Sequence, residues 1–550
     1  MHPVAVCENE RFRDKIVGKH RGFSSILRGA YEYTKRQRGI RAANVQLREI
    51  DEQLQAEGLP FPATMDLDEV RMMADGCAQS CTGIKNAKFV SQSEGRIAVI
   101  GSQRPASFED TLTEIITYIE SFGLSWPVKI TRNDTAETIQ KKNESAIARV
   151  CCAKWWRRKL KTRYSRQVES VAIQLGCVRQ GKSPYVSDWY FERWKGQQRK
   201  NRALIESMEM EEATTGEMVP MEAAVDASPS NPEIRRDELM VRIRGFEEIA
   251  DAMELRGLFL TLTCPSKYHA WKKSGQPNPK YQGYTPKQAS DYLCQVWARI
   301  RADWNRKGIR CFGFRVCEPH HDGTPHWHLM LFFCRNDLES AKRIFSDYAL
   351  HEDGFELGAK EYRSEIVEID PAKGTAAGYI AKYISKNIDA HGVDADFEGG
   401  VTGEEGAARV RAWASLWGIR QFQQIGCASV TVWRELRRRR EPLEEWEPEE
   451  AEAIREAADD GDWAKFVELM GGAFSGRDDQ KLRALYIEKP EPNTYQEEVK
   501  RIIGLVMRGA GRMIRTRFKV WIVHHNVGAG ANYEAGEKRA AAPPVLDLCQ

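Results

Sequence analysis

The stretch "EPHHDGTPHWHLMLF" at residues 318–332 decides the fold expected for this chain. It joins an alternating apolar segment, "IRCFGFRVCE" (309–318), to a second apolar segment, "HWHLMLFF" (326–333), through a turn that contains Asp322-Gly323. Asp-Gly between two strand-like segments is a strong signal for a hairpin. We therefore expect two antiparallel strands, the first of which ends at Glu318.

Three side chains of this hairpin are candidate metal ligands: Glu318, His326 and His328. Residues two apart on a strand point to the same face, so the two histidines project together and Trp327 projects to the other side. Glu318 joins them only if it pairs with His326, and that pairing needs an odd-length loop or a bulge. A strict two-residue turn at Asp322-Gly323 would instead place Glu318 opposite Trp327.

The residue types at this site favour catalysis. Two imidazoles and one carboxylate, with coordination positions left open, are typical of a catalytic rather than a structural metal site. The alternative is a pair of histidines satisfied within the sheet that binds no metal. His320 is a reserve ligand, and we expect it to lie with His321 in an exposed turn.

The pattern around the hairpin predicts an α+β fold in which helices back an antiparallel sheet. The helix over 285–308 begins with a capping box, with Thr285 as the cap and Gln288 three residues on. The order β-α-β-β-α-β is that of a split βαβ sandwich. The expected strands are 258–264, 309–318, 326–333, 363–370 and 429–433, and the expected helices are 285–308, 337–350 and 374–389.

The helix over 374–389, which contains "GYIAKYISKN", carries two tyrosines, Tyr379 and Tyr383. They are four residues apart and share one helical face, as do Lys382 and Lys386. A third row of isoleucines can pack on the sheet. The alternative to a functional pair is an amphipathic helix with half-buried tyrosines.

Charge is segregated along the chain although its net value is only +3. From Lys154 to Arg202, 14 Lys or Arg stand against three Asp or Glu. Aromatic residues are interleaved with these cations, a composition that suits single-stranded DNA. The alternative is a helical domain whose core is made by these aromatics. The candidate DNA contacts in this segment are Lys154, Arg157, Arg158 and Lys159.

These patterns divide the chain into four regions. Residues 1–207 are mainly helical, with DNA binding as a candidate role, and 208–238 form an acidic linker. Residues 239–440 hold the sheet, and 441–550 form an acidic, helical extension with a disordered tail.

The composition, with 42% hydrophobic residues and no long apolar segment, indicates a cytoplasmic protein that does not enter a membrane. Thirteen scattered cysteines predict no disulfide framework. A zinc site that includes Cys77 and Cys81 is an alternative use for two of them.

The hairpin and the two-tyrosine helix together resemble the HUH superfamily of single-strand DNA endonucleases. They are closer still to the replication gene A proteins of tailed phages. The stretches that carry the resemblance are "FLTLTCPSKYH" (259–269), "EPHHDGTPHWHLMLF", "GYIAKYISKNID" (378–389) and "WASLWGIRQFQQIG" (413–426).

The resemblance implies an HUH-type fold and an activity. Mg²⁺ or Mn²⁺ would be bound by Glu318, His326 and His328, and Tyr379 or Tyr383 would attack the origin DNA and leave a 5′-phosphotyrosine. Chain order alone favours Tyr379 as the first nucleophile. Lys382 and Lys386, in the same helix, are candidates for assisting the phenol or contacting DNA.

The expected function is therefore initiation of rolling-circle replication in the host bacterial cytoplasm. A host helicase, which would separate the strands, and the host replication machinery are expected partners. The alternatives are a two-tyrosine transposase or relaxase, and a binding-only initiator that recognises an origin and recruits a helicase.

Overall fold

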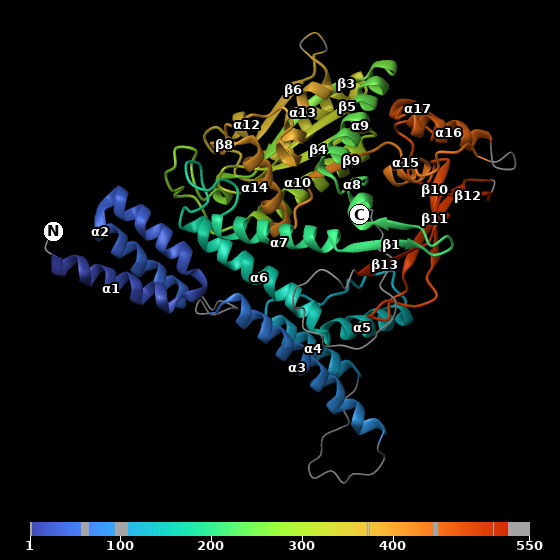
Figure 1. Cartoon of the computed structure of the whole chain (residues 1–550). Helices are drawn as coiled ribbons and strands as arrows, with labels where there is room; N and C mark the ends of the chain where they lie inside the picture. The colour runs from blue at the N-terminus through green and yellow to red at the C-terminus, as the bar shows by residue number, and fades with distance from the viewer. Residues whose placement is uncertain are drawn as a thin grey trace. The chain divides into compact units, whose positions relative to one another are not determined.

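The computed structural model describes residues 3–56, 65–93, 108–370, 372, 374–443, 449–509 and 511–525. The chain forms two compact units. The first comprises Met1–Cys177 and Glu488–Arg501, and the second comprises Val178–Ile487 and Ile502–Gln550. Figure 1 shows the elements of both units along the chain.

The second unit is built on a five-stranded sheet with the strand order β6-β3-β5-β4-β9. All neighbouring strands are antiparallel. From β3 to β6 the main elements follow the expected order β-α-β-β-α-β, with one additional short helix, α12 (Ala359–Tyr362), just before β6, and the α+β fold class is confirmed. The strands are β3 (Arg256–Thr263), β4 (Cys311–Pro319), β5 (Pro325–Phe333), β6 (Ser364–Glu368) and β9 (Phe422–Ile425).

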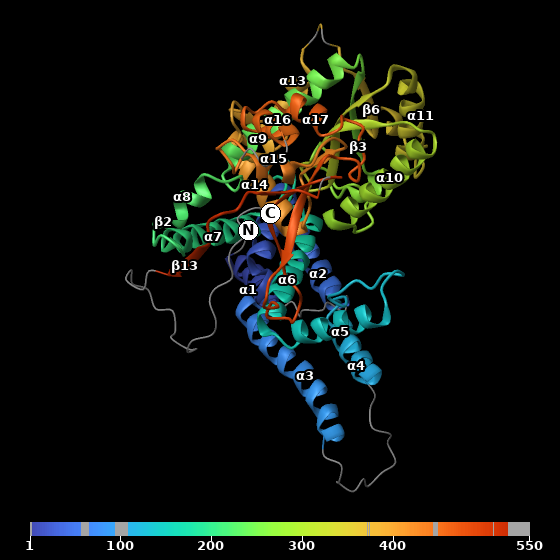
Figure 2. The same ribbon diagram turned by 90° about the vertical axis from the view of Figure 1, so that its right-hand side faces the viewer.

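Helices cover both faces of this sheet, which is why every residue of β5 is buried. Figure 2 shows α10 and α11 on one side of β3 and β6, and α9 and α13 on the other. The capping box expected at the start of α10 is present. The bounds are α9 (Pro232–Ala252), α10 (Pro286–Arg306), α11 (Leu338–Ala349), α13 (Ala376–Ile388) and α14 (Gly403–Trp417).

The hairpin between β4 and β5 has the register that brings the candidate ligands together. Glu318 pairs with His326, as the odd-length loop requires. His320 N donates to Thr324 O at 2.7 Å, so three residues close the turn. Gly323 lies at φ 84°, a left-handed conformation that glycine adopts without steric cost.

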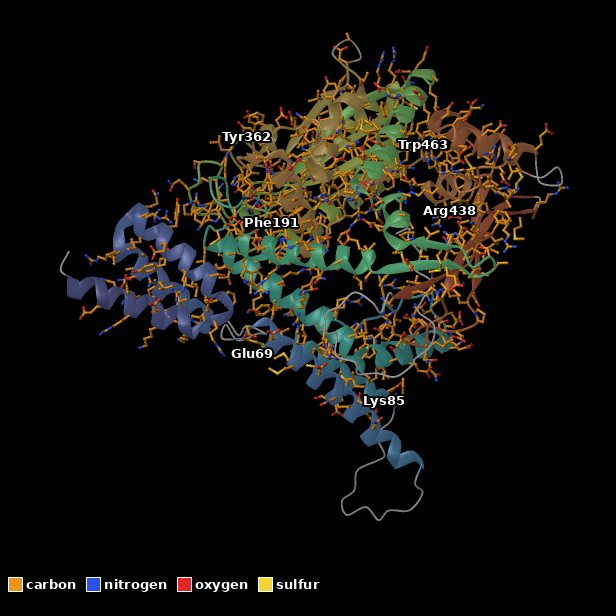
Figure 3. All side chains as sticks on the ribbon, viewed as in Figure 1. Glu69, Lys85, Phe191, Tyr362, Arg438 and Trp463 are labelled. Atoms are coloured by element: carbon orange, nitrogen blue, oxygen red, sulfur yellow. The ribbon has the colours of Figure 1, made fainter. Side chains whose placement is uncertain are left out.

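The last expected strand is wrong. Residues 429–433 belong to a helix, α15 (Val430–Leu436), and the edge strand is β9, within "WGIRQFQQIG". Val430, Thr431 and Val432 favour strands locally, but Trp433 and Leu436 are buried on one helical face, and this packing decides the conformation. Trp433 contacts Trp463 of α17 (Trp463–Leu469), with ring centroids 5.0 Å apart; Trp463 is labelled in Figure 3.

The acidic segment 208–238 is not an unstructured linker. It contains β1 (Met208–Glu212), β2 (Met218–Pro220), α8 (Met221–Asp226) and the start of α9. β1 lies between β2 and β13 (Trp521–His525), with Met210 opposite Val523. The partner strand lies more than 300 residues away, so the local composition of 208–238 could not reveal it.

The C-terminal extension is only partly helical. α16 (Glu449–Asp459) and α17 agree with the expectation, but a three-stranded sheet in the order β10-β11-β12 follows them. The strands are β10 (Leu482–Glu488), β11 (Lys500–Met507) and β12 (Met513–Arg515). The expected disordered tail, 536–550, lies outside the described residues.

The first unit is mainly helical over its described residues, as expected. Its longest helices are α2, α3 and α6, and the core of α6 is made by Trp155, Trp156, Leu160 and Tyr164. The segment 488–501 joins this unit through Glu497, which accepts hydrogen bonds from Ser145 and Arg149. The helices are α1 (Pro3–Lys19), α2 (Ser24–Ala56), α3 (Leu67–Ser93), α4 (Phe108–Ser121), α5 (Ala136–Val150) and α6 (Ala153–Gln174).

Candidate active site

Glu318, His326 and His328 converge on the face of the sheet that α13 covers. One ligand atom from each lies within 4.8 Å of the others, and all three residues are buried. The two histidine Nε2 atoms are 3.1 Å apart. Within the described part of the chain, this is the one such group of three that could hold a metal ion.

The hydrogen bonds of His328 leave its Nε2 available as a ligand atom. Thr261 of β3 donates its hydroxyl proton to Glu365 at 3.2 Å, and the same Thr261 oxygen lies 3.3 Å from His328 Nδ1. Thr261 Oγ1 therefore accepts from Nδ1–H, which directs the Nε2 lone pair toward the cluster. A hydrogen bond from the other ring nitrogen is the usual way in which a metal-binding histidine is oriented.

Burial keeps both histidines in the neutral form that binds metals. It lowers the pKa of His326 well below the ordinary value, and together with His320 and Lys386 it lowers the pKa of His328 to about 3. Burial also raises the pKa of Glu318 to about 7, although the Lys386 ammonium opposes this shift. Two neutral imidazoles and a carboxylate are a donor set that can hold a divalent cation, and a bound cation would favour the carboxylate form of Glu318.

Helix α13 fixes the carboxylate of Glu318 from the other side. Asn387 Nδ2 donates to Glu318 Oε1 at 2.5 Å, and Lys386 Nζ lies 3.6 Å from Glu318 Oε2. Gln421, which precedes β9, donates to Asn387 Oδ1 at 3.2 Å and so orients its amide. Sequence reasoning missed Asn387, although its spacing of four from Tyr383 places both on one helical face.

The N-terminal end of α13 is tied to its surroundings. Thr375 caps the helix by accepting from Gly378 N, and the Glu247 carboxylate of α9 accepts from Ala376 N at 2.6 Å. Both contacts satisfy N–H groups that lack partners within the helix. As expected, Ile380 and Ile384 are fully buried against the sheet.

The two tyrosines are half-buried and differ in their contacts with the ligand cluster. The ring of Tyr383 lies 4.1 Å from that of His328, centroid to centroid. The ring of Tyr379 lies 6.3 Å from Phe259, which also stacks on His328. Burial and the Glu318 carboxylate raise the pKa of Tyr383 to about 12. Its hydroxyl is therefore protonated at neutral pH and needs assistance to act as a nucleophile.

His320 lies beside the cluster but not within it. Its ring stacks on that of His326 with centroids 4.0 Å apart, and its Nδ1 lies 3.3 Å from Glu398 Oε1. The expectation that His320 and His321 lie in an exposed turn is wrong, since His321 is only 7% exposed. The turn is covered because Trp413 of α14 donates to Gly323 O at 2.8 Å.

The candidate DNA-contacting lysines of α13 have different environments. Lys382 is exposed, and its Nζ lies 4.9 Å from the centre of the Tyr383 ring. Lys386 faces inward, where Glu398 and Asp396 lie 3.2 and 3.6 Å from its ammonium. Burial alone would lower the pKa of Lys386, but these carboxylates and Glu318 outweigh burial and raise the pKa above its ordinary value. Lys386 is therefore held as a cation that neutralises the acidic side of the site.

The basic helix α6 belongs to the first unit. Lys154, Arg157, Arg158 and Lys159 are all exposed on it, and Arg157 donates to Asp75 at 2.8 Å. The aromatic residues interleaved with these cations are largely core residues, which agrees with the alternative interpretation. The buried aromatics of the whole segment 154–202 are Trp155, Trp156 and Tyr164 of α6, and Tyr185 and Phe191 of the second unit; Phe191 is labelled in Figure 3.

Cys77 and Cys81 are buried free cysteines on α3. They belong to no group of three or more close metal-ligand side chains over the described ranges. A zinc site at this position gains no support from the geometry.

The sequence of residues 85–391 matches the family model of the bacteriophage replication gene A protein. The chain belongs to the replication gene A protein family. The matched range includes α6, the hairpin and α13, so the candidate ligands and both tyrosines lie inside it.

Named relatives of the chain are phage and prophage replication proteins. It is 44% identical over 424 residues to "Replication gene A protein" of Escherichia phage 186, covering 73% of this chain and 61% of the relative. It is 39% identical over 392 residues to the protein of the same name from Escherichia phage P2, covering 68% of this chain and 51% of the relative. A Salmonella paratyphi A relative, 36% identical over 376 residues that cover 66% of this chain and 46% of the relative, is named "Probable replication endonuclease from prophage-like region".

The matched region thus spans about half to three-fifths of the length of these relatives. No solved structure matches the chain. Over the described residues, every helix is too short or too polar to span a bilayer.

Proposed function

We propose that this protein is a site-specific single-strand DNA endonuclease and strand transferase of the HUH type that initiates rolling-circle replication of a phage genome. The observation that carries the proposal is the placement of Tyr383 against His328, inside a buried Glu318–His326–His328 cluster. A phenol beside a set of cation ligands is the arrangement that phosphoryl transfer to tyrosine requires.

Glu318, His326 and His328 would hold Mg²⁺ or Mn²⁺, which when bound stabilises the charge that develops on the scissile phosphate. The tyrosine oxygen attacks phosphorus and forms the new O–P bond, while the bond from phosphorus to the 3′-oxygen breaks. The phenol proton is lost, and the departing 3′-oxygen gains a proton. The products are a 5′-phosphotyrosine and a free 3′-OH, from which a polymerase can extend.

For Tyr383 to attack, the site has to promote the loss of its phenol proton. With a pKa of about 12, roughly one phenol in 10⁵ is ionised at pH 7. Lys382 Nζ, which lies 4.9 Å from the ring centre, is a cation that could favour the phenolate. Contact with His328 favours Tyr383 over Tyr379 as the first nucleophile, in contrast to the order suggested by position in the chain.

The two tyrosines suit a cycle of two strand transfers. One carries the nicked 5′ end, and the other cleaves the regenerated origin so that the first end can be released as a circle. Each transfer exchanges one phosphodiester for another, so the cycle consumes no ATP. Strand separation would come from a host helicase in the bacterial cytoplasm, and replication from the host machinery.

A transposase or relaxase would use the same chemistry, and a binding-only initiator would use none. Membership in the replication gene A family supports the phage initiator. The deciding experiment incubates the protein and Mg²⁺ with labelled single-stranded fragments tiled across its own phage DNA. We expect one fragment to yield a covalent adduct at a single position. No adduct with any fragment, in Mg²⁺ or Mn²⁺, would support the binding-only role, and adducts only at element ends would support a transposase.

A further inference from the structure

An open pocket of about 860 Å³ adjoins the ligand cluster within the second unit. Its walls are the segment after β3 (residues 266–280), the hairpin turn at His320 and His321, and residues 397–398, which follow β7 (Ala395–Asp396). His320 belongs to both places, because it lines the pocket and stacks on His326. Whatever occupies the pocket therefore lies next to the atoms that would hold the metal.

The charge of the pocket is positive. Lys272, Lys273 and Lys280 line it, against one lining carboxylate, Glu398, that Lys386 already engages. Lys280 pairs with a glutamate at 3.0 Å. Among the described residues, no carboxylate lies within 4.0 Å of the Lys272 or Lys273 ammonium. Two cations thus remain available for an anionic ligand.

The pocket is also lined by an exposed aromatic ring, that of Phe397, whose neighbouring residues are held by hydrogen bonds. Phe397 is 90% exposed, although both of its neighbours are held in place. The Asp396 carboxylate accepts from the Tyr185 hydroxyl at 2.5 Å and from Glu398 N at 3.2 Å. Asp396 itself is only 3% exposed. An aromatic ring exposed in this way can stack on the face of an unpaired base.

We infer that this pocket binds the single-stranded DNA adjacent to the scissile phosphate, with Phe397 stacking on a base while Lys272 and Lys273 contact phosphates. The inference rests on the proposed function and names a nucleotide subsite for it. Cations beside an exposed ring are the combination that binds single strands, because every unpaired base offers a face for stacking. A pocket of this volume accommodates a ligand of about one or two nucleotides.

Binding to a fluorescein-labelled oligothymidylate about 15 nucleotides long tests the subsite, since such a length covers one binding module. Phe397→Ala should weaken binding about tenfold or more, and Phe397→Trp should restore it because a larger ring stacks at least as well. Lys272→Gln/Lys273→Gln should flatten the dependence of log K on log salt by about 1.4, at about 0.7 for each phosphate.

The matched control is Lys307→Gln/Lys465→Gln, which removes two exposed lysines of the same unit that do not line the pocket. It should change neither the affinity nor the slope. A hairpin duplex provides the second control, because its bases are already stacked and Phe397→Ala should leave its affinity unchanged. An affinity of Phe397→Ala for the single strand equal to that of wild type would overturn the subsite, and so would equal losses on duplex and single strand.

All binding measurements are repeated in the Tyr379→Phe/Tyr383→Phe background, where no covalent step can contribute. Photocrosslinking with 5-iododeoxyuridine in the oligonucleotide should attach it to peptides that contain Trp271 or Phe397. If the wild-type chain forms no adduct but the pocket variants lose binding, the proposed function fails and the subsite stands. If the wild-type chain nicks DNA but the crosslinks map elsewhere, the subsite fails and the proposed function stands.

Discussion

At the scale of single residues, the candidate metal site depends on the number of residues in one turn. With three residues between His320 and Thr324, Glu318 faces His326 and all three ligands share one face of the sheet. One residue fewer would move Glu318 opposite Trp327, which packs on the other face. The positive φ of Gly323 makes the three-residue turn possible.

We predict that His326→Ala or His328→Ala abolishes nicking while most of the DNA affinity remains. The ligand cluster acts on one phosphate, whereas binding is spread over many contacts. Adduct formation on the origin strand measures the first effect, and fluorescence anisotropy measures the second. Removal of divalent ions with a chelator should reproduce the loss in the wild-type chain, and Mn²⁺ should reverse it.

For Glu318→Ala we expect a smaller loss or a changed preference between Mg²⁺ and Mn²⁺, because the two imidazoles remain. His320→Ala is the comparison, since its ring stacks on His326 without joining the cluster. Greater damage from His320→Ala than from Glu318→Ala would show that His320 is the third ligand. Wild-type cleavage by either His326→Ala or His328→Ala would refute the metal site.

Asn387 is a positioning residue in this scheme, since it acts through Glu318, to which its amide donates. Asn387→Ala should raise the Mn²⁺ concentration for half-maximal nicking by about 10- to 100-fold, which is the usual effect of losing a hydrogen bond to a metal ligand. Excess Mn²⁺ should restore much of the rate, which would not occur if the variant were simply misfolded. Gln421→Ala removes only the contact that orients Asn387 and should give a weaker effect of the same kind. An unchanged metal requirement in Asn387→Ala would contradict the assignment.

At the scale of elements, the sequence predicts those parts of the fold whose signals are local. The capping box of α10, the Asp-Gly hairpin and the isoleucine row of α13 each lie within one short segment, and each is present in the structure. The element at 430–436 was missed because its β-branched residues favour a strand, whereas burial of Trp433 against α17 selects a helix.

Long-range partners explain the other differences. β1 depends on β13, so the acidic segment around Met210 gave no sign of a strand. Asn387 stands in the two-tyrosine helix, but its partner Glu318 is 69 residues away and its role is visible only once the sheet is formed. The ligand residues are predictable from the sequence because two of them lie on one strand.

The exposed cations of α6 are expected to affect DNA affinity rather than the cleavage reaction. Replacement of Lys154, Arg157, Arg158 and Lys159 by Gln should weaken single-strand binding and flatten its salt dependence. The slope should change by about 0.7 for each phosphate that the variant no longer binds, and Arg157 should contribute least because it pairs with Asp75. Anisotropy titrations over a range of KCl concentrations measure the slope.

The control for α6 is Lys129→Gln/Arg132→Gln/Lys141→Gln, which removes exposed cations from another part of the same unit. It should leave the slope close to that of wild type. An unchanged slope in the α6 variant would mean that this helix faces something other than DNA. The melting temperature of the α6 variant should equal that of wild type, because the substituted side chains lie outside the core formed by Trp155 and Trp156.

At the scale of the whole molecule, the proposed function combines strand transfer at this site with strand separation by another protein. The segment "GCVRQGKS" (176–183) fits the GxxxxGK[ST] pattern, but it follows the helix α6 rather than a strand, so it lacks the strand–loop–helix context of a phosphate-binding loop. The proposed cycle therefore assigns strand separation to a host helicase. The proposed replication cycle makes one demand on the pair of tyrosines. The 5′ end must stay attached to one tyrosine through a full round of synthesis, while a second nucleophile remains free beside the same ligand cluster.

The two tyrosines of α13 meet this demand unequally, and this gives the last prediction. Tyr383→Phe should reduce the first adduct more than Tyr379→Phe does, because only Tyr383 contacts His328. Each single variant should keep some attachment through the remaining hydroxyl but fail to release unit-length circles, since the second transfer lacks its nucleophile. Loss of a hydroxyl alone leaves both rings packed on Phe259, so the melting temperature should be preserved. The double variant should bind DNA and form no adduct. Mass spectrometry of the trapped peptide maps the attachment, and an adduct outside residues 376–388, or any adduct from the double variant, would exclude the two-tyrosine mechanism.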